Sequence, residues 1–316
     1  MEVIDVGFNG YNQVFPSTYH QFNSADFNLL NEARCDQLLY LVFKDTKNRL
    51  GIIAGVKGNE LHTPFSAPFG GFSFIREDIS ISQIEAGVEA LIQFAIDKKY
   101  GAIYYTMPPL FYQQGFNNKL LNIMYRKNFQ VAAVDLNYEF NLQKFTDNYE
   151  ADIWHNARKN LRISVKLGFD FIKCETFETK SAAYDVIKEN RSRKGYPLKM
   201  TYEQVLKTAE VIPADFFVLK KESEQVAAAI IFHVAPGIVQ VIYWGDIPDF
   251  ANYKPMNFLA YSVFKYYKEQ RFKFVDIGPS TENGIPNYGL CEFKESIGCD
   301  ISLKFSFIKT IGLEAV

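Results

Sequence analysis

The chain has 316 residues, 48% of them hydrophobic and 22% charged, which is enough apolar material for two compact domains. Its formal net charge of -2 excludes a general attraction to nucleic acid, so we expect no DNA partner and only local basic sites. The sequence has no apolar run near the roughly 20 residues of a membrane helix, no CxxC pair and no basic, apolar leader at its start. The composition therefore predicts a cytoplasmic protein without a membrane span.

The first half alternates between predicted strands and helices. A hairpin is expected over 38–56, and apolar residues at helical spacing predict a helix over 80–99 with a capping box at Ser82 and Glu85. Between them, TPFSAPFGGFSF (63–74) has the pattern of a strand interrupted by Pro and Gly, which fits a bend beside a ligand. The other expected elements are helices over 17–30 and 117–127 and strands over 102–106 and 131–141.

A polar segment, 142–150, predicts a boundary between an N-terminal domain (1–145) and a C-terminal domain (146–316). The second domain is expected to begin with a basic helix over 152–167 and to end with an alternating strand over 300–308. Between these, we expect a strand over 169–174, helices over 181–194 and 201–211, a hairpin over 216–234, a strand over 238–246, a helix over 256–270 and a strand over 272–278.

The stretch 237–294 is the most informative part of the chain. Strand, helix and strand with a short crossover imply a parallel strand pair, and ligands meet such a unit at the end of a strand and the start of the helix. A similar series of hairpin, broken strand, helix and strand occurs in the first half. The two predicted helices align without a gap, because Ile84 and Met256 begin matching apolar series at a constant offset of 172. Each half is therefore predicted to be a mixed α/β sheet.

This order of elements resembles the GNAT acyltransferase fold, whose fourth and fifth strands are parallel neighbours that splay apart to admit an acyl donor. Two such halves in tandem resemble the Fem-type (FemABX) peptidoglycan aminoacyltransferase superfamily. TPFSAPFGGF resembles that family's PYxxxGG-like segment, NARKNLRISVKLGF its basic helix, and GLCEFKESIGCD its closing G-x-x-x-F-K-x-x-F/I-G motif. The resemblance implies two tandem GNAT-like domains, a degenerate first one and a second with the main cleft. It also implies an N-acyltransferase that moves an acyl or aminoacyl group to an amine of a cell-envelope or sugar-nucleotide precursor.

Two departures from the pattern concern the acyl donor. The loop IPDFANYKPMN (247–257) has no glycine where the GNAT pyrophosphate loop carries several, so coenzyme A would lack its close backbone cradle. The long charged hairpin of several Fem-type ligases, which is thought to help hold tRNA, is absent. We therefore expect no tightly bound cofactor and a donor that is either aminoacyl-tRNA or an acyl thioester, with tRNA or acyl carrier protein as partners beside a small or nucleotide-linked acceptor.

Two carboxylates are the candidate catalytic groups. Asp276 lies in FKFVDIG, a strand expected to be buried, where it is either held by neighbouring backbone amides or acts as the base that accepts the proton of an attacking amine. Asp246, at the end of the preceding strand, competes with it for that role. Backbone amides near Trp244–Asp246 are expected to stabilise the oxyanion.

The candidate binding residues surround the same unit. Tyr243 and Trp244 are wall residues or simply core, Lys254 is an anion-binding cation or a plain loop lysine, and Lys294 is a site residue or pairs with Glu292 and Glu295. The turn STENGIPNYG follows a parallel strand, where loops often carry function, and its candidates are Ser280, Thr281 and Asn287.

Two further candidates lie outside that unit. Arg158, Lys159 and Arg162 on the basic helix are either a solvated face or a phosphate clamp. Phe69 and Gly70 of the first half are expected to help bind the acceptor. The four histidines have no ligand spacing, so no metal site is expected.

Two other functions fit the sequence as well. The missing glycine loop favours a non-catalytic binding protein on a GNAT-like scaffold, because a fold alone does not license chemistry. The third possible function is an acyl-CoA-dependent N-acetyltransferase that binds coenzyme A through side chains instead of a glycine loop.

Overall fold

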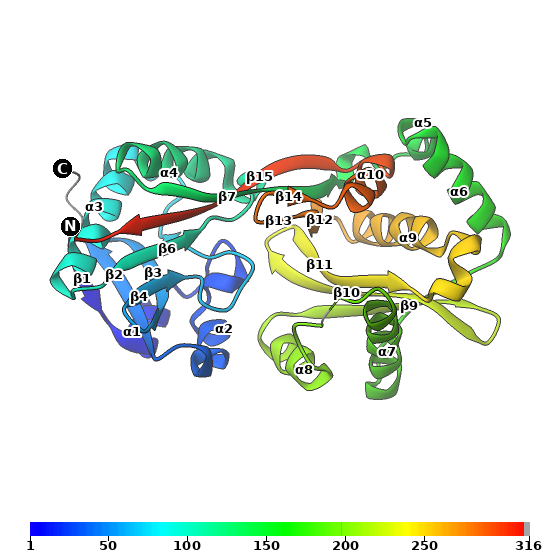
Figure 1. Ribbon diagram of the computed structural model, residues 1–316, viewed down its shortest axis with the longest axis horizontal. Coiled ribbons are helices and arrows are strands. Elements are labelled where there is room, and N and C mark those ends of the chain that lie inside the picture. The colour runs from blue at the N-terminus through cyan, green and yellow to red at the C-terminus, as the bar shows by residue number, and fades with distance from the viewer. Residues whose placement is uncertain (197, 313–316) are drawn as a thin grey trace. The chain divides into compact units, whose positions relative to one another are not determined.

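The computed structural model describes residues 1–196 and 198–312, and these separate into two compact units (Figure 1). Unit 1 comprises Met1–Leu136 and the chain from Ser302 onward, and unit 2 comprises Asn137–Ile301. The last strand thus groups with the first unit, which a single division at residue 145 does not provide for. In the described part of the chain, no helix combines the length and the apolar character that a membrane crossing requires.

Unit 1 is a mixed sheet with helices packed on it. Its strands are hydrogen-bonded in the order β1, β2, β3, β4, β6 and β15, with β5 pairing to β3, and only β4 and β6 run parallel. The strands are β1 (Glu2–Asp5), β2 (Gln37–Lys44), β3 (Asn48–Lys57), β4 (Glu60–Thr63), β5 (Phe72–Phe74), β6 (Ala102–Thr106) and β15 (Asp300–Thr310). The helices are α1 (Gly7–Val14), α2 (Ala25–Leu30), α3 (Ile81–Asp97) and α4 (Gln114–Arg126).

Helix α3 shows why this sheet is covered. Its capping box is made by Ser80 and Gln83, so the predicted box at Ser82 and Glu85 is wrong by two residues. Both pairs fit the Ser-x-x-Glu/Gln pattern. Ser80 forms the cap because its backbone is extended, which lets its hydroxyl accept a hydrogen bond from the Gln83 amide. The buried face of α3 packs on β3 so closely that a Cβ at Gly87 would lie 2.4 Å from Leu50.

Unit 2 repeats the plan with more helices. Its strands are hydrogen-bonded in the order β7, β12, β11, β10, β9 and β8, and only β11 and β12 run parallel. The strands are β7 (Gln130–Asn141), β8 (Asp170–Lys173), β9 (Ala214–Lys221), β10 (Glu224–Ala235), β11 (Ile238–Asp246) and β12 (Phe274–Pro279), with a separate small hairpin of β13 (Thr281–Glu282) and β14 (Ile285–Pro286). The helices are α5 (Tyr149–Asp152), α6 (His155–Lys166), α7 (Phe177–Arg193), α8 (Tyr202–Val211), α9 (Pro255–Glu269) and α10 (Tyr288–Ser296).

The core of unit 2 fixes the helix that connects the two parallel strands. Phe264 of α9 stacks on Phe140 of β7 with ring centres 3.9 Å apart, and Leu259 and Val263 are fully buried beside it. Helix α10 was not predicted, since its sequence follows a turn rich in Pro and Gly; Asn287 begins it by accepting a hydrogen bond from the Leu290 amide. The mixed α/β architecture expected for both halves is confirmed.

Candidate functional site

The parallel strands of unit 2 pair over only three positions. Ile238, Val239 and Gln240 of β11 lie opposite Phe274, Val275 and Asp276 of β12. Beyond them β11 continues along β10 as far as Asp246, and β12 continues along β7 as far as Pro279. Segments 241–246 of β11 and 277–279 of β12 are therefore not paired with each other. We call these two segments and the gap between them the strand opening.

The edge of β11 presents backbone amides at this opening. The amide of Ile247 donates to Val226 of β10 at 2.9 Å, and peptide directions alternate along a strand. The amides of Trp244 and Asp246 therefore face away from β10, toward the side that β12 has left. The Asp246 carbonyl, which faces the same side, accepts a hydrogen bond from the Asn190 side chain at 2.6 Å.

Asp276 lies at the fork where the two strands part. It is 0% exposed, and its carboxylate accepts from the Asn137 amide at 2.8 Å, from Gln240 at 2.7 Å and from the Gly278 backbone at 2.9 Å. The strand bulges here, and Gly278 takes a φ of 74°, which a residue without a side chain adopts freely. The bonds show that Asp276 fixes the shape of the fork, and they combine one backbone amide with two side-chain amides.

Lys294 of α10 closes the other side of the fork. It is buried, and its ammonium donates to the carbonyls of Ile277, Gly278 and Pro279 at 3.1, 2.8 and 3.2 Å. Burial lowers the pKa of Lys294 to about 8. Of the two acids considered as its partners, Glu295 instead accepts a hydrogen bond from the Tyr138 hydroxyl at 2.9 Å. The lysine thus places a cation beside the strand opening.

Ser280 adds a polar atom to this fork. Its hydroxyl is buried and has no hydrogen-bond partner, while its carbonyl accepts from the Asn287 amide at 2.8 Å. The side-chain oxygens of Asn137 and Gln240 are likewise buried and unpartnered. Because buried polar groups are nearly always hydrogen-bonded, three unpartnered oxygens mark the fork as a polar cluster inside the protein.

The two candidate carboxylates do not meet. Asp246 lies six residues beyond Gln240 along β11, about 20 Å from the fork at 3.3 Å per residue. There it contacts α7, through the Asn190 amide at 3.3 Å and the Lys194 ammonium at 3.6 Å. Only one of the two can touch a given reacting amine.

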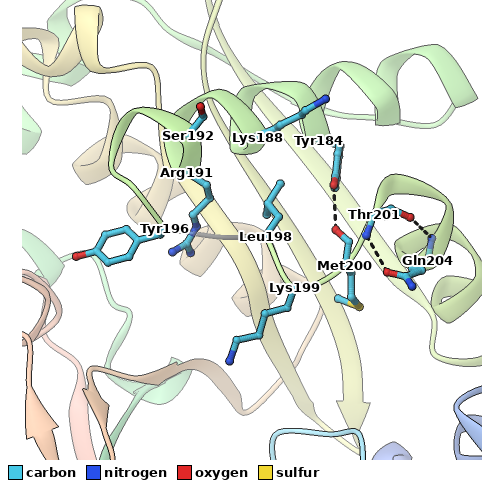
Figure 2. A pocket seen from close by; sticks show the side chains of 10 residues that line it. All are labelled: Tyr184, Lys188, Arg191, Ser192, Tyr196, Leu198, Lys199, Met200, Thr201 and Gln204. Atoms are coloured by element: carbon cyan, nitrogen blue, oxygen red, sulfur yellow. Dashed lines mark hydrogen bonds between the residues drawn. The ribbon is translucent and has the colours of Figure 1, made fainter. Parts of the chain in front are cut away.

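A hollow of about 300 Å³ lies beside β11, between α7 and the segment that leads into α8 (Figure 2). Three of its lining residues are cations, Lys188, Arg191 and Lys199, and none is acidic. The Arg191 guanidinium lies 6.0 Å from the ring centre of Tyr243, and its Nε is buried without a partner. Figure 2 shows Arg191 extending from α7 toward Leu198, with Lys188 pointing along the helix away from it.

The hollow and the fork are linked through the turn that follows β12. The Asn287 amide donates to the Tyr196 hydroxyl at 3.3 Å, and Tyr196 lines the hollow. Tyr243 joins them from β11: burial raises its pKa, which the backbone amides of Met200 and Lys199 partly oppose. The structure thus brings together Tyr243, Asn287, Ser280 and Lys294, which the sequence analysis singled out separately.

Other candidates near this unit have structural roles. Trp244 packs on Phe293, with ring centres 6.0 Å apart, in the core of unit 2. Lys254 takes a φ of 57° immediately before α9, and the helix then opens with Pro255, which has no amide to offer an anion. Thr281 lies half-buried in the short strand β13.

The cations of α6 separate into two groups. Arg158 donates to the carbonyls of Ala151 and Ile153, at 2.7 and 3.3 Å, and Arg162 pairs with Glu150 at 2.8 Å. Both arginines therefore hold helix α5, while Lys159 is exposed. All three line a second hollow of about 470 Å³ along the outer side of α6.

The two candidates of unit 1 are packing residues. Phe69 is 1% exposed and lies among the rings of His20, Phe22 and Tyr112. Gly70 donates its amide to Thr106 at 3.0 Å, and a Cβ there would lie 3.0 Å from the Pro64 backbone. Neither side chain position is open to an acceptor.

Several residues of the site were missed by the sequence analysis, above all Asn190, Arg191, Lys199 and Gln240. A signal for the first three exists, because residues 190–202 contain four cations and no acid. The sequence gives no sign of the role of Gln240. A single polar residue in a strand can be assigned to a site only when its neighbour on the adjacent strand is known.

No protein-family model matches the sequence, and no curated protein is similar enough in sequence to match it. Among solved structures, FemX shares the fold with a TM-score of 0.71 at 13% identity, over 98% of this chain and 98% of that one. L-PGS from Bacillus licheniformis gives a TM-score of 0.61 at 16% identity, over 98% and 92%. A tandem GNAT protein from the clavulanic acid biosynthesis pathway gives 0.51 at 9% identity, over 88% and 84%.

These identities are low, so the likeness concerns the fold. The chain has a Fem-like GNAT fold, as the resemblance of its motifs predicted. Its structural neighbours include FemX and a tandem GNAT protein, and what this chain shares with them is the architecture.

Proposed function

We propose that the chain is an N-acyltransferase whose reaction takes place at the strand opening of unit 2. The observation that supports this most is the early end of the β11/β12 pairing, because it leaves the amides of Trp244 and Asp246 facing the gap between the two strands. The acyl or aminoacyl group goes to an amine of a cell-envelope or sugar-nucleotide precursor.

The reaction is a direct attack within a ternary complex. The amine nitrogen attacks the donor carbonyl, a C–N bond forms, the C–O or C–S bond to the carrier breaks, and the leaving oxygen or sulfur takes up a proton. One of the two amides, that of Trp244 or that of Asp246, donates to the oxyanion, because along the strand they lie about 7 Å apart and cannot share one oxygen. Such a donor is the largest single contribution that a site of this kind can make.

The two carboxylates then have different roles. Asp246, which lies at the opening and beside the cationic hollow, accepts the proton that the attacking amine loses. Asp276 is a positioning residue that keeps the fork open through Gln240 and Gly278. Lys294 is also a positioning residue, because its bonds to the carbonyls of Ile277, Gly278 and Pro279 hold the β12 side of the strand opening.

The cationic hollow holds the anionic part of the acceptor. Lys188, Arg191 and Lys199 line it without an opposing acid, and a nucleotide-linked acceptor supplies phosphates that match them. Because α9 starts with a proline and its preceding loop folds into a 3-10 turn over Pro248–Tyr253, coenzyme A is not the expected donor.

The test is product formation with a panel of donors. Acetyl coenzyme A, octanoyl acyl carrier protein and alanyl-tRNA are each mixed with the full chain and UDP-glucosamine, whose amine is the acceptor, and the N-acylated sugar nucleotide is measured by mass spectrometry. We expect product with one of the last two donors, and the Asp246→Asn variant should lower kcat at least about 100-fold.

Three outcomes would contradict the proposal. Product from none of the donors would favour a binding protein on an acyltransferase scaffold, and product from acetyl coenzyme A alone would favour an acetyltransferase. Full turnover by Asp246→Asn would remove the role given to this carboxylate.

A further inference from the structure

Helix α6 carries a straight row of basic side chains on its outer side. His155, Lys159, Arg162 and Lys166 are spaced by four, three and four residues, so each lies one turn above the last on one side of the helix. We call these four the α6 row. It runs over the 12 residues of the helix, about 16 Å from the first to the last at 1.5 Å per residue, and all four side chains are exposed.

The row is a local feature in a chain whose charge is otherwise slightly acidic. The net charge is -2, yet no acidic residue occurs between Ile153 and Phe169. A helix that served solubility alone would carry acidic side chains paired at helical spacing, and α6 has none. Within the described part of the chain, Arg162 is the one member of the row that pairs with an acid, Glu150 of α5.

The helix that carries the row packs on elements next to the proposed reaction site. Helix α6 packs against α9 and α10 within unit 2, and the Trp154 amide before α6 donates to the carbonyl of Ser296 at the end of α10 at 3.0 Å (Figure 1). Helix α10 carries Lys294, and α9 follows the end of β11. A partner seated on the row therefore lies on the outer side of α6, one helix away from α9 and α10.

From this we infer that the α6 row is the docking surface for an acidic carrier protein that brings the acyl group as a thioester. The inference rests on the proposed function and adds the partner. The matching surface on the carrier is one helix with acidic side chains, since a helix of similar length presents charges at the same spacing.

The chemistry of the surface favours a protein partner over RNA. The row has the length of one short helix, and the negative charge of the whole chain opposes a larger polyanion. The hollow along the row includes Ile163, which is exposed, and Trp154 is exposed at the start of the helix. Apolar and aromatic side chains among basic ones are typical of protein interfaces, whereas nucleic-acid interfaces are more uniformly positive.

The test measures binding of labelled octanoyl acyl carrier protein and of labelled tRNA to the full chain by fluorescence anisotropy. The double charge reversal Lys159→Glu and Lys166→Glu should weaken carrier-protein binding at least about 10-fold. A matched control, Lys47→Glu and Lys207→Glu, changes the net charge equally at exposed lysines outside α6 and should bind within twofold of the wild type. Both variants should keep the thermal stability of the wild type.

The outcomes separate this inference from the proposed function. If the wild type binds the carrier protein and the α6 variant binds it equally well, the α6 row is not the docking site. If the wild type does not bind the carrier protein at all, the inference is also overturned. Binding of tRNA, lost in the same variant, would replace the carrier protein with RNA. Turnover of octanoyl-N-acetylcysteamine, a small thioester that has no carrier to dock, should be equal in the wild type and the α6 variant. Its absence in both would instead count against acyl transfer.

Discussion

The two units contain the same parallel strand pair in different states. In unit 1, β4 pairs with β6 along its whole length, from Glu60 opposite Ala102 to Thr63 opposite Tyr105. In unit 2, the pairing of β11 with β12 stops after Gln240 and Asp276, although both strands continue. The register makes His62 and Tyr104 the counterparts of Gln240 and Asp276.

The residues at that register explain the difference. His62 and Tyr104 stack with their ring centres 4.5 Å apart and their planes at 3°, and the Tyr104 hydroxyl donates to Glu60 at 3.2 Å. In unit 2 the same positions hold a buried carboxylate and the amide that bonds it. The chain after β4 then folds back on the pair, because the Phe72 amide donates to the Tyr105 hydroxyl at 2.8 Å. The shared fold supplies the strand pair, and a few residues decide whether it stays closed.

The largest expected effect is at the fork. In Asp276→Asn, one donor must face the new amide NH₂, so we expect a loss of about 2–3 kcal/mol of stability. The matched change in unit 1, Tyr104→Phe, removes one half-exposed hydrogen bond and should cost less than about 1 kcal/mol. Urea unfolding followed by circular dichroism measures both losses. Equal losses of unfolding free energy would mean that the two strand pairs are stabilised to the same extent.

The second prediction concerns acid. Asp215 of β9 is buried, which raises its pKa, but three side chains donate to it and lower the pKa to about 2. The donors are His233 at 2.7 Å, Tyr267 at 2.8 Å and Lys173 at 2.8 Å. Because the pKa in the folded state lies below the ordinary value of 3.8, the stabilisation is present above about pH 4 and is lost as the pH falls toward 2.

This loss should be confined to unit 2. When the hairpin 38–56 is aligned with 216–234 and the helices are aligned at the offset of 172, unit 1 has Gln37, Gly55 and Ala95 where unit 2 has Asp215, His233 and Tyr267. Both tryptophans of the chain, Trp154 and Trp244, lie in unit 2, so their fluorescence reports this unit alone. An acid titration of the wild type should show a transition between pH 4 and 2, and Asp215→Asn should lack that pH dependence. A transition that persists in the variant would assign it to other carboxylates.

The smallest effect is expected at the cationic hollow. Arg191→Ala should raise KM for the acceptor about 10-fold with little change in kcat, because it removes binding shared by the ground and transition states. Arg193→Ala is the control, since Arg193 points to Glu189 and Asp249, at 2.7 and 2.8 Å, and does not line the hollow. Equal effects of the two variants would mean a general charge effect.

The sequence predicts the regular elements better than the site. Hairpins with β-branched and aromatic runs and long amphipathic helices carry their own periodicity, and the order of elements therefore emerged in both halves. The capping box of α3 was predicted two residues too late because two such patterns overlap there, and α10 was missed because its sequence resembles a turn. Local sequence patterns predict the ends of helices less reliably than their existence.

The site depends on contacts that no local pattern encodes. The Asp276 carboxylate meets Asn137 from 139 positions earlier in the chain and Gln240 from 36 earlier, so the fork exists only once β7, β12 and β11 are neighbours. The segment GLCEFKES did identify Lys294, but its bonds to three carbonyls required the bulge at Gly278. The sequence analysis placed Phe69 and Gly70 with the acceptor, whereas both are used in packing unit 1.

The central claim is that the open pair of unit 2, and not the closed pair of unit 1, carries the reaction. The direct measurement is the rate of N-acyl product formation by two variants of the full chain whose circular dichroism is that of the wild type. Lys294→Met changes the fork of unit 2, and Glu60→Gln changes the corresponding pair of unit 1. We predict that Lys294→Met lowers kcat/KM at least about 100-fold while Glu60→Gln stays within twofold of the wild type. Equal rates for the two variants, or a larger loss in Glu60→Gln, would contradict the account.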